Sequence, residues 1–84
     1  MIKLVYFAWI RERIGKSEET IDLPDGVVTV SDLIDHLRTR GEEYALALET
    51  PEVIHVAINQ EHSQHGDALG DAREVALFPP MTGG

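Results

Sequence analysis

The most regular pattern in the chain is TVSDLIDHLRTRG, residues 29–41. Its apolar side chains recur at the i, i+3, i+4 and i+7 positions of one helical face: Val30, Leu33, Ile34 and Leu37. Thr29 and Asp32 have the spacing of a capping box, and Arg38 and Arg40 fall in the last turn, where the helix dipole favours cations. Gly41 is a natural stop. We therefore expect one main amphipathic helix that ends at Gly41 and buries its apolar stripe.

The first and last segments of the chain predict the sheet that covers this helix. Residues 2–7, IKLVYF, and residues 73–78, REVALF, are rich in β-branched and aromatic side chains and are apolar on both alternating faces. Strands that are covered on both sides lie in the middle of a sheet, so we place these two next to each other at its centre. Further strands are expected at residues 18–23, at residues 53–59 and, weakly, as an edge strand within residues 61–72.

Two short helices complete the expected fold. Residues 8–14 carry Ile10 and Ile14 on one helical face, and residues 42–49 form a second helical piece that Pro51 brings to an end. This order of elements predicts an α+β fold, with a mixed sheet packed against one main helix. We expect a domain over residues 1–78, followed by a flexible C-terminal tail over residues 79–84.

The composition limits what the chain does. Its 84 residues suffice for one domain. The formal net charge of −8 disfavours binding to nucleic acid and suits a partner with a basic face. There is no cysteine, which excludes disulfides and cysteine nucleophiles. We find neither a signal peptide nor an apolar run of membrane-spanning length, and therefore expect a cytoplasmic protein.

The last seven residues, FPPMTGG, combine an aromatic residue, two prolines and two terminal glycines. A segment that only ends the fold has no need of this combination. Pro79 and Pro80 stop the last strand from pairing onward and favour an extended backbone. Gly83 and Gly84 have no Cβ and can enter a narrow channel. Fully extended, residues 78–84 span about 20 Å, which is enough to reach into the cleft of a neighbouring protein. The pattern favours an arm that delivers the terminal carboxylate.

Three stretches resemble the MoaD family of small, sulfur-carrying subunits of molybdopterin synthase. They are YFAWIRERIG at residues 6–15, VAINQE at residues 56–61 and EVALFPPMTGG at residues 74–84. The terminal Phe-Pro-Pro-x-x-Gly-Gly is the most specific of them. The resemblance implies a ubiquitin-like β-grasp fold. It also implies a role as a sulfur-donating subunit without catalytic side chains of its own.

In such a family the C-terminal glycine is adenylated, converted to a thiocarboxylate, and gives its sulfur to cyclic pyranopterin monophosphate in molybdenum cofactor biosynthesis. The resemblance makes Gly84 the reactive end. The implied partner-binding residues are Gly83, Thr82, Met81, Pro80, Pro79, Phe78 and Phe7. The implied partners are a large MoaE-type subunit and a ubiquitin-activating-type adenylating enzyme. That enzyme uses the ATP, so no cofactor is expected on this chain.

Other functions share the same terminal chemistry. A sulfur carrier for thiamine, cysteine or a tungsten cofactor would need the same glycine, as would a ubiquitin-like modifier that is joined to lysines. A plain interaction domain with an idle tail is a further alternative. Glu61 and His62 stand where the family often has an apolar residue, which affects the expected partner surface.

The remaining candidate residues point to structural roles. His62, His65 and Asp67 have a spacing that a metal ion would tolerate, but their polar segment favours solvated loop side chains, and we predict no metal site. Trp9 and Arg13 are four residues apart on a helix and are expected to stack. For Trp9, Phe7 and Phe78, core burial and exposure at an interface are both open.

Overall fold

The computed structural model describes residues 1–80. In chain order its elements are β1 (Ile2–Tyr6), α1 (Ala8–Ile14), β2 (Glu18–Ile21), α2 (Val30–Arg38), α3 (Glu42–Ala47), the 3-10 turn η1 (Pro51–Val53), β3 (His55–Ile58), β4 (Glu61–Ser63) and β5 (Glu74–Phe78). Each predicted helix and strand is present, the weak edge strand included.

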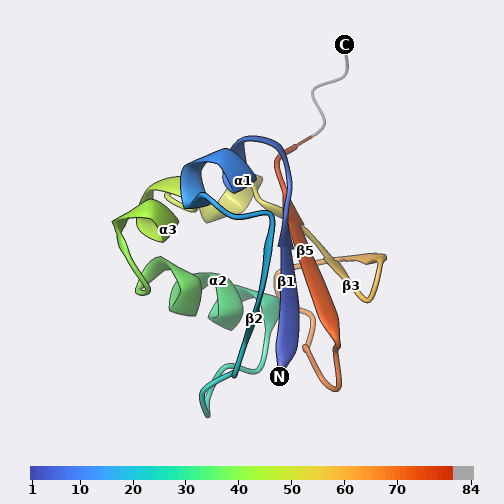
Figure 1. The fold of residues 1–84 in the computed structure, drawn as a ribbon. Helices are drawn as coiled ribbons and strands as arrows, with labels where there is room; N and C mark the ends of the chain where they lie inside the picture. The colour runs from blue at the N-terminus through green and yellow to red at the C-terminus, as the bar shows by residue number, and fades with distance from the viewer. Residues whose placement is uncertain (81–84) are drawn as a thin grey trace.

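The five strands form one sheet in the order β2-β1-β5-β3-β4 (Figure 1). β1 and β5 pair in parallel, with Leu4 opposite Val75, whereas the other neighbouring pairs are antiparallel. The sheet is therefore mixed, and the last strand of the chain is its central strand. This confirms that the first and last strands are adjacent.

The helices gather on one side of this sheet (Figure 1), and the core lies between the two layers. α2 contributes the apolar stripe that the sequence predicts, and all four of its members are fully or almost fully buried: Val30, Leu33, Ile34 and Leu37. They pack with the inward side chains of the central strands, among them Leu4, Tyr6, Val75 and Leu77. This two-layer α+β arrangement is a β-grasp fold.

The start of α2 agrees with the sequence, but its end does not. The Thr29 hydroxyl accepts the Asp32 backbone N–H at 3.2 Å, and the Asp32 carboxylate accepts the Thr29 N–H at 3.1 Å, which completes the capping box. The helix ends at Arg38, because the Thr39 hydroxyl donates to the His36 carbonyl at 2.6 Å and closes the last turn. Gly41 is not its stop, since it lies in extended backbone ahead of α3.

Two expectations about the strands were wrong. Residues 51–53 form η1, because Pro51 begins a tight turn in which the Val53 N–H donates to the Thr50 carbonyl. β3 therefore starts at His55. The central strands are also not covered on both sides, since the helices cover one face only (Figure 1). The other face of the sheet is open. No helix within residues 1–80 is long and apolar enough to cross a membrane.

Candidate functional site

The open face of the sheet brings together the partner-binding residues that the sequence predicts within the described part of the chain. Phe7 follows β1 and Phe78 ends β5, and the Phe7 N–H donates to the Leu77 carbonyl at 3.1 Å. Pro79 is half-buried and Pro80 is exposed. The predicted residues Met81, Thr82, Gly83 and Gly84 lie outside the described residues.

A groove of about 1030 Å³ runs along β5 from Glu74 to Pro80, just beyond the end of the strand. We call it the exit groove. Its lining is Phe7, Ala8, Trp9, Val53, Ala57, Gln60, Glu74, Ala76, Phe78, Pro79 and Pro80. Among these, Glu74 alone has an ionisable side chain, so the groove offers apolar contact area and little means for acid–base catalysis. Such a surface suits the docking of another protein.

The junction between β1 and α1 shapes one side of the exit groove. Ala8 has a φ of +53°, which a residue with a Cβ seldom adopts. This left-handed residue separates Phe7, which is 47% exposed, from Trp9, which is half-buried against the core. The Arg13 guanidinium lies 4.6 Å from the Trp9 ring centroid, as the helical spacing predicts. Phe7 is therefore a surface residue, and neither phenylalanine belongs to the buried core.

Three rings meet at the base of the tail, an arrangement that the sequence did not predict. The His55 ring stacks on Phe78 with centroids 5.7 Å apart and an interplanar angle of 18°. His62 stands edge-on to both rings, at 5.6 Å from His55 and 6.1 Å from Phe78. These contacts depend on the register of β3 with β4 and β5. His62 therefore lies on β4, packed against the end of β5, and is not a loop side chain.

His65 and Asp67 both lie within hydrogen-bonding distance of backbone groups in and near their loop. One ring nitrogen of His65 lies 2.7 Å from the Ile54 carbonyl oxygen. The Asp67 carboxylate accepts the Gln64 N–H at 2.8 Å. Within residues 1–80 no three histidine or acidic side chains come together as metal ligands.

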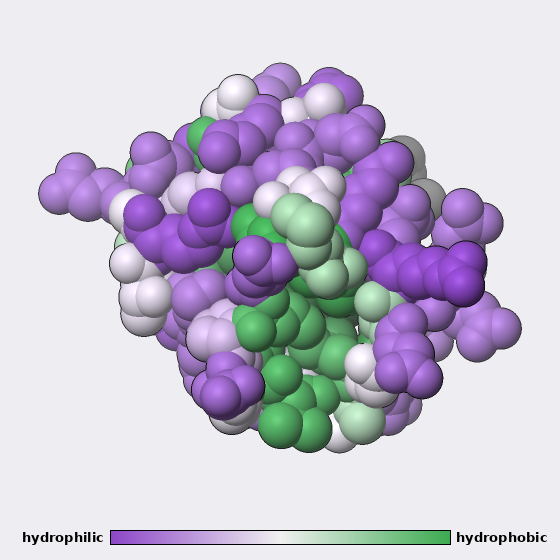
Figure 2. Space-filling view, turned by 60° about the horizontal axis from the view of Figure 1, so that its bottom comes forward, coloured by the Kyte–Doolittle hydropathy of each residue, from purple (hydrophilic) through white to green (hydrophobic). Residues whose placement is uncertain are grey.

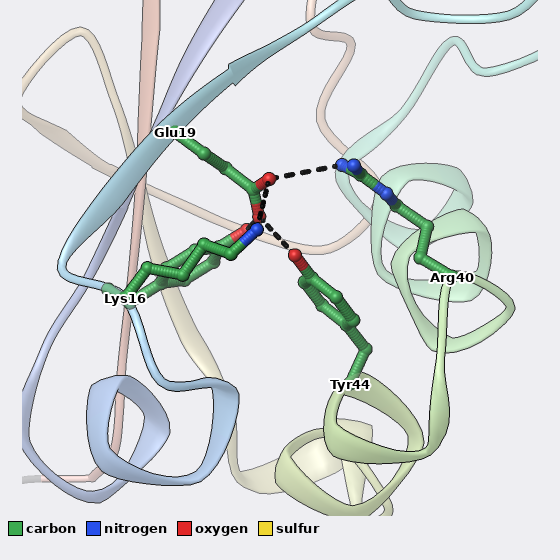
Figure 3. A network of polar contacts seen from close by, with 5 residues as sticks. Lys16, Glu19, Arg40 and Tyr44 are labelled. Atoms are coloured by element: carbon green, nitrogen blue, oxygen red, sulfur yellow. Dashed lines mark hydrogen bonds and ion pairs between the residues drawn. The ribbon is translucent and has the colours of Figure 1, made fainter.

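A polar network that joins four parts of the fold is centred on Glu19 of β2 (Figure 3). The Glu19 carboxylate accepts the hydroxyls of Tyr6 and Tyr44 at 2.7 and 2.6 Å. It also lies 3.4 Å from the Lys16 ammonium and 3.5 Å from the Arg40 guanidinium. Arg40 therefore serves this network and not the last turn of α2. The network ties the edge strand to β1, to α3 and to the chain after α2.

The same contacts set the protonation of the network. Burial alone would raise the pKa of Glu19, but the hydrogen bonds from Tyr44 and Tyr6, together with Arg40 and Lys16, outweigh it and hold that pKa below its usual value. Burial and the hydrogen bond to Glu19 raise the pKa values of both tyrosines. Glu19 is therefore ionised and both phenols are neutral at physiological pH.

Comparison with known proteins places the chain in a family. The model of the ThiS family matches residues 4–84. The molybdopterin synthase sulfur carrier subunits of Haemophilus influenzae and Escherichia coli K12 are 39% and 40% identical to the chain, and each match covers 100% of both proteins. The crystal structure of small archaeal modifier protein 1 from Haloferax volcanii aligns with a TM-score of 0.72 at 30% identity, over 95% of this chain and 97% of that one.

These matches run over the full β-grasp domain and through the Phe-Pro-Pro-x-x-Gly-Gly end. Two relatives above 30% identity, each matched along its whole length, carry the same description. The chain belongs to the ThiS family and, within it, to the sulfur carrier subunits of molybdopterin synthase.

Proposed function

We propose that this chain carries sulfur on its terminal glycine and delivers it inside a molybdopterin synthase. The observation that carries the proposal is the way the central strand ends. β5 stops at Phe78 beside the apolar exit groove, and Pro79 and Pro80 follow it. A partner that docks on this groove would contact Pro79 and Pro80, the residues that precede positions 81–84 in the sequence.

The terminal carboxylate needs activation before it accepts sulfur. A carboxylate is ionised at neutral pH and is a poor electrophile. In the proposed cycle an adenylating partner joins Gly84 to AMP, with release of pyrophosphate from ATP. A hydrosulfide ion, released by the sulfur donor, then attacks the carbonyl carbon, the bond from that carbon to the AMP oxygen breaks, AMP leaves, and the sulfur loses its proton to water. The product is a thiocarboxylate at Gly84.

The large synthase subunit is the proposed acceptor of the loaded chain. Its active site would take residues 81–84 and pass the sulfur to cyclic pyranopterin monophosphate. The pterin pocket and the catalytic side chains belong to that subunit in this proposal, because the exit groove carries one ionisable side chain, Glu74. The chain is thus a sulfur-donating subunit, and we place the reaction in the cytoplasm.

Intact-mass measurement tests the proposal directly. The purified chain is incubated with the adenylating enzyme, ATP and a sulfur donor, and one oxygen should be replaced by one sulfur. Deleting Gly84, or appending one alanine after it, should prevent the exchange. Both variants should melt at the wild-type temperature, because the core consists of side chains between Ile2 and Leu77. If the mass of the wild-type chain does not change under conditions that form a thiocarboxylate on a known sulfur carrier, the proposal is wrong.

A second candidate function is a protein modifier joined to lysines. The likeness to small archaeal modifier protein 1 favours it, and the activated glycine would be the same. The two functions differ in the acceptor, which is a pterin in one and a lysine amine in the other. Peptide mass spectrometry of trypsin-digested cell proteins would reveal lysines that carry residues 74–84 if the chain is a modifier, because Arg73 is the last tryptic site. Loss of these remnants on deleting Gly84 would confirm the assignment.

A further inference from the structure

The base of the tail lies at the end of the sheet that Figure 2 turns away from the viewer. Figure 2 looks at the end where the N-terminus lies, and apolar side chains gather there as well. β5 runs parallel to β1 and stops at Phe78, at the opposite end. Only six residues separate Phe78 from Gly84, so a protein that takes up the terminal glycine comes close to the side chains around Phe78.

Two histidines continue the open face of the sheet beyond the exit groove. His55 of β3 lies opposite Phe78, and His62 of β4 lies opposite Ala57. Both Phe78 and Ala57 line the groove. His62 is exposed and His55 is half-buried. A protein that is seated on the groove would therefore also come against these two rings.

The contacts of these histidines are with other rings. His55 stacks on Phe78 with centroids 5.7 Å apart, and the His62 ring lies 5.6 Å from that of His55. No hydrogen bond or ion pair found within residues 1–80 involves either imidazole. When neutral, such rings present an apolar body with a polar tip. In that state they extend the apolar surface of the groove.

Few titratable groups surround the two rings. Glu52, just before β3, and His65, which lies against the Ile54 carbonyl, line the same small hollow as both histidines. Glu61 precedes His62 on β4, and Phe78 brings no charge from β5. Histidine is the side chain whose charge ordinarily changes between pH 5 and pH 8. A fall in pH through this range therefore adds positive charge at the base of the tail.

Positive charge at this place opposes docking for two reasons. A partner on the apolar groove removes water from the neighbouring rings, which disfavours their charged form. The acidic chain also suits a partner with a basic face, which a protonated ring would repel. We propose that His55 and His62 make docking of the large synthase subunit depend on pH, so that it binds while both rings are neutral and is released when they are protonated. This dependence rests on the proposed function, because that function supplies the large subunit as the occupant.

Isothermal titration calorimetry of the full chain with the large synthase subunit of the same organism tests this. The dissociation constant is measured at about pH 7.5 and about pH 5.5. For the wild type it should be about tenfold larger at the lower pH. In the double variant His55→Leu/His62→Leu this ratio should be about tenfold smaller than in the wild type, and the comparison cancels groups that titrate on the large subunit. His62→Lys places a fixed cation there and should weaken binding about tenfold at the higher pH.

His36→Leu is the matched control, because His36 is half-buried on α2 in the helical layer. It should keep the wild-type ratio, and melting curves at both pH values show that each variant is folded. The proposal fails if wild-type binding is equal at the two pH values or tighter at the lower one, if the double variant keeps the wild-type ratio, or if His36→Leu loses that ratio as well. Absence of binding at both pH values would overturn this proposal and the docking step of the proposed function together, whereas formation of the thiocarboxylate is tested separately by mass.

Discussion

Phe7 is an exposed aromatic side chain that lines the exit groove. It is 47% exposed on the rim of the exit groove and lies outside the core. Phe7→Ala should therefore weaken binding to the large synthase subunit by about tenfold or more, as for an aromatic anchor at an interface, and leave the melting temperature unchanged. Isothermal titration calorimetry measures the first and thermal denaturation the second.

Leu46 provides the matched control for that experiment. It is similarly exposed, at 55%, but does not line the groove. Leu46→Ala should bind the large subunit like the wild type. Equal losses for both variants would mean that Phe7 has no special part in docking.

Glu19 makes the stability of the domain depend on pH. The pKa of Glu19 is lower in the folded state than its usual value of 4.5. The ionised carboxylate therefore stabilises the fold, and this stabilisation is fully present above pH 4.5. It is lost as the pH falls through the lowered pKa, where Glu19 becomes protonated in the folded protein too. Glu19→Gln should reduce the free energy of unfolding at pH 7 by about 1–3 kcal/mol, since two buried phenols lose a charged acceptor. The difference from the wild type should shrink as the pH falls below about 4.5.

Urea denaturation of both proteins at pH 7 and at acidic pH measures this effect. Tyr44→Phe serves as a partial control, because it removes one of the two phenol hydrogen bonds and should cost about 1 kcal/mol. If Glu19→Gln loses the same amount of unfolding free energy relative to the wild type at both pH values, Glu19 is not an ionised group at the centre of the network.

The sequence contains a signal for the inward position of Glu19. Glu19 has the same strand parity as Ile21 and Leu23, and the structure places it opposite the buried Leu4. An acid on the inward face of a strand needs partners. Those partners, Tyr6 and Tyr44, come from segments 13 and 25 residues away. No local pattern indicates such long-range pairing.

At the scale of elements, the capping box is the local device whose contribution is easiest to isolate. Thr29→Ala removes the hydroxyl that accepts the Asp32 N–H and should reduce the free energy of unfolding by about 1 kcal/mol. Thr50→Ala is the control, because no side-chain hydrogen bond caps the turn that follows Thr50. Chemical denaturation measures the free energy of unfolding of both variants. If both lose the same amount, the Thr29 hydroxyl does not stabilise α2 as a cap.

The elements were largely predictable because their signals are local. The apolar period of α2, its capping pair and the strand-like runs at both ends follow from neighbouring residues. The end of α2 was missed because Gly41 resembles a stop, while Thr39 closes the helix through its own side chain. The contacts among the rings of His55, His62 and Phe78 depend on the register of three strands. That register cannot be read from the sequence, so the sequence did not predict the cluster.

At the scale of the whole molecule, charge should control how fast the carrier finds its partners. The net charge of −8 attracts a basic surface from a distance, and salt screens that attraction. The association rate constant with the large subunit should fall about tenfold between low and high ionic strength, with a smaller change in the dissociation rate. Stopped-flow measurements at several salt concentrations test this. An association rate that does not respond to salt would show that the acidic surface takes no part in the encounter.

The general architecture was accessible from the sequence, including the neighbouring positions of the first and last strands. The open face was not, because apolar residues on both sides of a central strand predicted two covered faces. The structure leaves one face free with Phe7 upon it, so apolar residues on both sides of a central strand do not require two covered faces. The division into a domain over residues 1–78 and a tail over residues 79–84 stays a prediction.

The position of β5 in the middle of the sheet has a consequence for damaged copies of the protein. A chain cut before Phe78 loses the strand that pairs with both β1 and β3, and cells degrade such unfolded fragments. Cleavage after Phe78 spares all five strands that the structure describes within residues 1–80. A molecule trimmed within positions 79–84 should therefore keep its fold, and under the proposed function it would compete with intact copies for the same partner without bearing sulfur.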